Sequence, residues 1–126
     1  MLAACLRNAS AVAKGASELG GTIGVIPGGE RWGLNMAGVG ESFGPLRPCV
    51  EDYLGAGAVL AALSGSASPE ARLAVTAFQN TDVAAAVRAC GSGQELIAHG
   101  HAADVELAVQ LGVSDAVPVL IDGVLR

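Results

Sequence analysis

The chain has 126 residues, a hydrophobic content of 52% and a formal net charge of −5 at pH 7. This length predicts one domain spanning 1–126, and the lack of a basic cluster excludes a nucleic-acid backbone as partner because nothing neutralises its phosphates. No apolar run approaches the roughly 20 residues that cross a bilayer, so we expect a cytoplasmic protein with no membrane partner.

The start of the chain predicts a strand, a helix and a second strand. The run 2–6 is apolar and short, which is typical of a strand or the remnant of one. Asn8 suits the N-cap of a helix over 9–19, which two glycines then end. The apolar run 22–26 (TIGVI) predicts a buried strand. Such a unit is expected to cross over right-handed into a parallel sheet.

Polar side chains follow both predicted strands. Pro27-Gly28-Gly29 ends the second strand abruptly, so Glu30 and Arg31 lie just past its carboxyl end. Ligands bind at that edge in open α/β sheets, and Asn8 holds the same topological position after the first strand. The alternatives are that Asn8 is only an N-cap and that the glycines are only a turn.

Three charged residues lie at the start of the next predicted helix. Pro48 fits its first turn, which puts Arg47 at the N-cap, and Glu51 and Asp52 follow where the helix macrodipole favours negative charge. As an alternative, Arg47 and Glu51 are four residues apart and form an ordinary surface pair. The glycine-rich segment 33–44 that precedes this helix has no core pattern, and such loops are usually functional or disordered.

Two glycines interrupt that helix. Each costs about 1 kcal/mol relative to alanine, so Gly55 and Gly57 indicate that backbone or ligand approaches closely. For Gly57 we expect packing of the helix on a sheet, and for Gly55 either packing or a ligand. The candidate core residues of the helix are Val50, Leu54, Leu60 and Leu63.

The rest of the chain predicts short helices and a terminal hairpin. Ser68 with Pro69 opens one helix, Thr81 or Asp82 opens another, and Ser92 with Glu95 forms a capping box. Gly100 and Gly112 suit helix ends, and the histidines at 99 and 101 suit a solvated surface. The run 117–121 with the turn Asp122-Gly123 predicts a strand and a small hairpin.

The three cysteines, Cys5, Cys49 and Cys90, form no CxxC or metal-binding spacing. They are typical of buried, inert thiols in a reducing compartment. The alternative is a thiol-dependent hydrolase that uses Cys49 or Cys90, although neither has a histidine nearby in the sequence.

Several strings of residues, in chain order, carry a family pattern. They are CLRNASAVA (5–13), IGVIPGGERW (23–32), LRPCVEDYLGAGAV (46–59), SPEA (68–71), CGSGQEL (90–96), DVELA (104–108) and SDAVPVLIDG (114–123). Together they resemble the carboxyl-terminal half of the 2-phosphosulfolactate phosphatases. The resemblance implies an α/β fold with a small, mostly parallel sheet packed with several helices, as half of a larger three-layer phosphatase.

The resemblance also implies an activity, which is magnesium-dependent hydrolysis of a phosphate ester on sulfolactate in coenzyme M biosynthesis. The catalytic residues would be Glu30, Glu51 and Asp52, with Glu30 and Asp52 as ligands of Mg²⁺. The residues that bind the small anionic substrate would be Asn8, Gly29, Arg31 and Arg47. The residues alone leave open which carboxylate binds metal and which acts as base.

Two functions therefore stand side by side. One is a phosphatase or its ligand-binding half, and the other is a non-catalytic module for anion binding or assembly. Few strands are predicted to cover the apolar helices, so we expect a homo-oligomer. We also expect binding of phosphate or a sulfonated carboxylate with little turnover by this chain alone.

Overall fold

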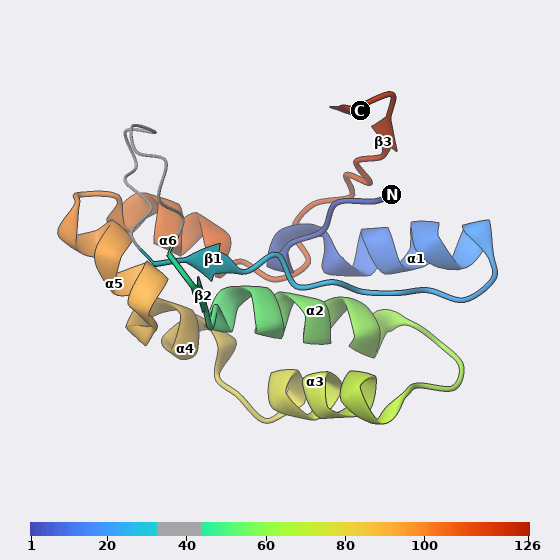
Figure 1. The fold of residues 1–126 in the computed structure, drawn as a ribbon, viewed down its shortest axis with the longest axis horizontal. Helices are drawn as coiled ribbons and strands as arrows, with labels where there is room; N and C mark the ends of the chain where they lie inside the picture. The colour runs from blue at the N-terminus through green and yellow to red at the C-terminus, as the bar shows by residue number, and fades with distance from the viewer. Residues whose placement is uncertain (33–43) are drawn as a thin grey trace.

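The computed structural model describes residues 1–32 and 44–126. In that part of the chain, helices dominate and two very small sheets accompany them (Figure 1). The elements are η1 (Leu6–Asn8), α1 (Ala9–Leu19), β1 (Glu30–Arg31), β2 (Leu46–Arg47), α2 (Val50–Ala62), α3 (Pro69–Gln79), α4 (Val83–Ala89), α5 (Gly91–Ala98), α6 (Ala102–Ala108), β3 (Leu120–Ile121) and β4 (Val124–Leu125). Residues 33–43, most of the predicted glycine-rich loop, lie outside the described residues. No described helix has the length and apolar character needed to cross a membrane.

The helix α2 is the centre of the packing. It lies between α1 and α3 and also contacts α4 (Figure 1). Its Ala58 and Val59 belong to a buried cluster of mostly small aliphatic residues, completed by Leu6, Ala9, Ala13, Val87 and Val105. Small side chains let the helices approach closely.

The prediction of a mostly parallel sheet is wrong. Both sheets in the described residues are antiparallel pairs, β1 with β2 and β3 with β4. The run 22–26 forms no strand and instead passes between α1 and α2 towards β1 (Figure 1). A strand forms only where a neighbour pairs its backbone, and the described part of the chain supplies no such neighbour for 22–26.

Most helix boundaries agree with the predicted signals. The helix α1 spans the predicted 9–19 and ends at Gly20, with φ +73°. Ser68 caps α3 by accepting from the Ala71 N–H at 3.2 Å, and Asp82 caps α4 by accepting from Ala85 at 3.0 Å. Capping by short polar side chains is a local interaction, which explains why it could be predicted.

Two helix starts differ from the prediction. The N-cap of α2 is Cys49 rather than Arg47, so Pro48 precedes the helix. The predicted capping box of Ser92 and Glu95 is also wrong, because α5 begins at Gly91 and both residues lie inside it. Their side chains are engaged elsewhere, as described below.

The glycines of α2 have opposite surroundings. A Cβ on Gly57 would lie 2.4 Å from the carbonyl oxygen of Ala74 on α3, so this glycine lets one helix pack on another helix rather than on a sheet. A Cβ on Gly55 would meet no described atom within 4 Å. Leu54 is buried as predicted, whereas Val50 is exposed.

The two ends of the chain lie together and project from the helices (Figure 1). β3 and β4 form the predicted hairpin, and its turn residues Asp122 and Gly123 both have positive φ, as a type I′ turn requires. Leu2 forms an antiparallel bridge with Val119, so the first residues are indeed a remnant of a strand.

Candidate active site

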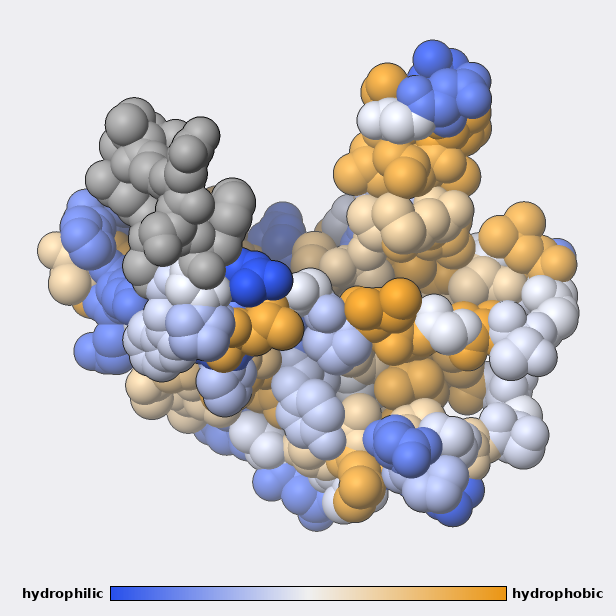
Figure 2. Space-filling view, in the orientation of Figure 1, coloured by the Kyte–Doolittle hydropathy of each residue, from blue (hydrophilic) through white to orange (hydrophobic). Residues whose placement is uncertain are grey.

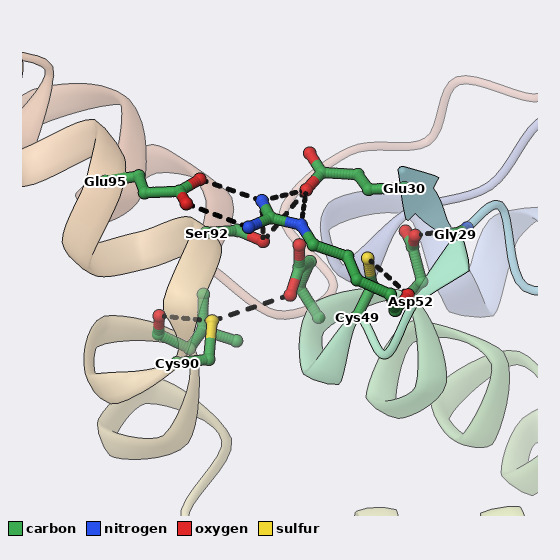
Figure 3. Close-up of polar contacts among 10 residues, drawn as sticks. Gly29, Glu30, Cys49, Asp52, Cys90, Ser92 and Glu95 are labelled. Carbon is green, nitrogen blue, oxygen red and sulfur yellow. Dashed lines mark hydrogen bonds and ion pairs between the residues drawn. The ribbon is translucent and has the colours of Figure 1, made fainter. Parts of the chain in front are cut away.

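Glu30, Ser92 and Glu95 surround the guanidinium of Arg47 in a polar cluster built by three elements (Figure 3). The register of β1 and β2 places Glu30 directly opposite Arg47, and Arg47 Nε donates to Glu30 Oε2 at 2.7 Å, with Nη2 also bonded to that oxygen. From α5, Glu95 accepts from Nη1 at 2.9 Å and from Nη2 at 2.8 Å. The pair of Arg47 and Glu95 is therefore bidentate, the geometry that makes arginine–carboxylate pairs strong.

Two further side chains complete the surroundings of the guanidinium. Ser92 Oγ lies 3.3 Å from both Arg47 Nη2 and Glu30 Oε2, and the ring of Trp32 is centred 5.2 Å from Arg47 Cζ, within the range of a cation–π contact. The Arg47 side chain is only 9% exposed. Its hydrogen bonds to Glu95 and Glu30 raise the pKa of Arg47, and Arg47 in turn lowers the pKa of Glu95.

The first turn of α2 brings two more carboxylates to the cluster. Asp52 Oδ2 accepts from the backbone N–H of Gly29 at 2.7 Å, which ties the loop before β1 to the start of α2 (Figure 3). Glu51 Oε2 lies 3.5 Å from Cys90 Sγ. Both acids lie in the first turn, where the helix macrodipole stabilises negative charge.

One group of side chains in the cluster has the spacing of a metal site. One ligand atom each of Glu30, Cys49 and Glu51 lies within 4.8 Å of the other two. The two carboxylates suit Mg²⁺, which typically binds one or two of them and keeps several waters. The thiol does not suit it, because burial raises the pKa of Cys49 and keeps it protonated. Asp52, the other predicted metal ligand, is outside this group.

The formal charge of the cluster is negative. Four carboxylates accompany one guanidinium, an excess of three negative charges. They are those of Glu30, Glu51, Asp52 and Glu95, and the guanidinium is that of Arg47. An anionic ligand is repelled by such a site unless a cation first compensates the charge.

The remaining predicted residues have other surroundings. Arg31 is exposed, and its Nη1 donates to the carbonyl of Gly44 at 3.1 Å. Asn8 is buried; its Oδ1 accepts from the Cys5 N–H at 2.8 Å and its Nδ2 donates to the Ala116 carbonyl at 3.0 Å. These contacts join the two ends of the chain rather than the Arg47 cluster.

Sequence reasoning missed Ser92 and Glu95 on α5 and Trp32, which directly follows β1. The spacing of Ser92 and Glu95 predicts a local capping box, although the string CGSGQEL that holds them is one of the family-like motifs. Trp32 adjoins the Glu30-Arg31 pair, and no periodicity distinguished it. The prediction of buried thiols holds for Cys49, whereas Cys5 is exposed and Cys90 is intermediate.

Beside the cluster lies an apolar cavity of about 500 Å³ at the start of α2. Its lining includes Pro27, Pro48, Val50, Tyr53 and Ala77, and Arg47 and Asp52 reach its wall. Charged groups at the rim of an apolar cavity are typical of small-molecule sites.

Comparison with known proteins identifies the family. Residues 1–123 match the family described as 2-phosphosulpholactate phosphatase. The chain belongs to this family. It is 34% identical over 123 residues to the 2-phosphosulfolactate phosphatase of Methanothermobacter thermautotrophicus, and the match covers 97% of this chain and 48% of that protein.

The chain therefore spans about half the length of the curated relative that it matches. No solved structure matches the chain significantly. The match to the phosphosulfolactate phosphatase family confirms the resemblance predicted from the sequence, and the matched range contains the whole Arg47 cluster. The roles of the individual cluster residues remain predictions.

Proposed function

We propose that this chain forms the ligand-binding part of a 2-phosphosulfolactate phosphatase, with Glu30 and Glu51 holding Mg²⁺. The observation that carries the proposal is the close approach of these two carboxylates in a cluster with excess negative charge. When bound, the cation would neutralise phosphoryl oxygens and orient a water for attack.

The two arginines have different tasks in this proposal. Arg31 is exposed and is the guanidinium that receives the phosphate or sulfonate. Arg47 directs its N–H groups at Glu30, Glu95 and Ser92, so a substrate could bind it only by displacing one of them. We therefore assign Arg47 to positioning Glu30, with direct substrate contact as the alternative prediction.

Turnover by this chain alone should be low. The chain corresponds to about half of its relative, and a misplacement of about 1 Å in a reacting group can cost on the order of 100-fold in rate. Asp52 is tied to Gly29 and Glu51 is assigned to the cation, so this chain leaves the general base unassigned. Binding without hydrolysis is the expected behaviour.

A second candidate function is a non-catalytic assembly module. The saturation of Arg47 by internal partners favours it, because a guanidinium that is fully paired stabilises structure without any ligand. In this case the cluster would bind neither cation nor phosphate. The predicted homo-oligomer would fit either function.

Titration calorimetry separates the two functions. Mg²⁺ is titrated into the wild type, into Glu51→Gln and into the matched control Glu106→Gln, whose carboxylate pairs with Arg88 on an exposed surface. Altering groups around a metal typically weakens binding by roughly 10- to 100-fold, so loss of the ligand Glu51 should cost at least that. Equal affinity of wild type and Glu51→Gln would contradict the proposed site.

A second titration tests the anion. Phosphosulfolactate or inorganic phosphate should bind the wild type in the presence of Mg²⁺ and much more weakly without it. Phosphate release is measured in parallel. Robust release by the chain alone would show a complete enzyme, and no binding of either ligand would favour the assembly module.

A further inference from the structure

Residues 21–28, here called the unpaired segment, run between α1 and α2 without regular structure (Figure 1). No backbone–backbone hydrogen bond joins them to any described residue. Ile23 and Val25 are half-buried, and Val25 packs against the core, whereas Gly24 and Ile26 are exposed. This alternation with a period of two residues is the signature of a β-strand.

An apolar groove of about 700 Å³ accompanies the unpaired segment. Its lining combines the first residues of the chain, α1, the unpaired segment and α2, and it includes Leu2, Ala16, Ile23, Gly55 and Val59. Apolar atoms gather on this side of the molecule, beside the projecting ends of the chain (Figure 2). Leu19 and Ile26 are 76% and 89% exposed. Contiguous apolar surface of this kind marks an interaction site.

Gly55 is an independent sign of close approach. It lies in the middle of α2 and lines the groove, and no described atom lies within 4 Å of the position its Cβ would take. A glycine there costs about 1 kcal/mol of helix stability relative to alanine, and no contact among the described residues requires the missing side chain. A polypeptide backbone packed against α2 from the groove side would require it.

The length of the relative indicates what occupies the groove. This chain is matched over 97% of its residues, yet it covers only 48% of the Methanothermobacter protein. We infer that a strand from the complementary part of the family fold, the part that this chain does not match, pairs with the unpaired segment and fills the groove. Addition of a strand to an open edge satisfies the free backbone groups, and alternate side chains give specificity.

The groove also leads to the Arg47 cluster. Glu51 and Asp52 line it as well as the cluster, and a Cβ on Gly28 would lie 3.5 Å from Asp52 Oδ2. A polypeptide docked along the unpaired segment therefore reaches the carboxylates at the start of α2. The complementary part would thus be placed to add groups to the same site.

Binding to a defined probe tests the inference. The probe is the part of the Methanothermobacter relative that this chain does not match, produced separately and mixed with the full chain. We expect a one-to-one complex by light scattering, with slower hydrogen exchange at the amides of 22–26. Ile26→Asp should weaken the complex at least tenfold, whereas Leu73→Asp, on the exposed side of α3, should leave its affinity unchanged.

Several outcomes of these measurements would overturn the inference. Unchanged exchange at 22–26 in a complex, or equal binding by wild type and Ile26→Asp, would place the contact elsewhere. Co-expression of the two polypeptides replaces mixing if the probe is insoluble alone, and failure to copurify then counts against the inference. A dimer of this chain through 21–28 that the probe does not displace would make a second copy the occupant. These readouts do not involve Mg²⁺ or hydrolysis, so the proposed function can fail independently.

Discussion

The opposite surroundings of Gly55 and Gly57 predict opposite effects of the same substitution. Both glycines lie inside α2, so alanine gains about 1 kcal/mol of helix propensity at either position. At Gly55 the added methyl group meets no described atom within 4 Å. Gly55→Ala should therefore raise the free energy of unfolding of the isolated chain by up to about 1 kcal/mol.

Gly57→Ala places the methyl group against α3. Its Cβ would lie 2.4 Å from the Ala74 carbonyl oxygen and 2.7 Å from Phe78 Cβ, whereas ordinary contacts begin at 3.4 Å. The two helices must separate by about 1 Å, and overpacking of this kind typically costs about 1–3 kcal/mol. The cost is at the upper end because the nearest atom belongs to rigid backbone. After the gain in propensity, we expect a net loss of about 2 kcal/mol.

Urea unfolding followed by far-ultraviolet circular dichroism measures both effects. The midpoint should rise for Gly55→Ala and fall for Gly57→Ala with the slope unchanged, since a change of slope would signal an altered unfolded state. A loss of about 2 kcal/mol leaves a typical domain folded, so both variants can be compared directly. Equal midpoints for the two variants would refute the close packing of α2 on α3.

Three further predictions concern the charged and thiol groups. Arg47→Ala should lower the urea midpoint more than Arg88→Ala does, because Arg47 links β1, β2 and α5 while Arg88 forms one exposed pair. A larger fall of the midpoint in Arg88→Ala would contradict the structural importance of the Arg47 cluster. Arg47 lowers the pKa of Glu95, so the stability from this pair is present above the ordinary pKa of about 4.5 and is lost as the pH falls through the lowered value. Glu95→Gln should accordingly flatten the acid limb of unfolding midpoint against pH, and an unchanged limb would count against the pair. Ellman's reagent should modify the exposed Cys5 in the folded chain and Cys49 only on unfolding, since Cys49 is buried and burial raises its pKa. Early modification in the double variant Cys5→Ser/Cys90→Ser, whose only thiol is Cys49, would contradict this.

The local signals of the sequence were the most reliable. The boundaries of α1 and the caps of α3 and α4 depend on side chains within three residues of the helix end, and the terminal hairpin depends on a two-residue turn. The prediction of a capping box from the Ser92–Glu95 spacing was wrong because it also considered only neighbours in the sequence. A local partner was assumed for both residues, but Arg47, more than 40 positions away in the chain, binds them instead.

The amino-acid sequence by itself determined the family, the acidic start of α2 and the apolar, strand-like character of 22–26. It also predicts a site that contains Glu30 and Arg47, but it does not show that these two side chains face each other. The tertiary structure alone decided that β1 and β2 pair in a register that joins these two side chains, and that α5 adds Glu95. It also decided that 22–26 has no partner strand among the described residues. Periodicity reports which face of a segment is apolar, whereas strand pairing and long-range ion pairs depend on which other segments are present to complete them.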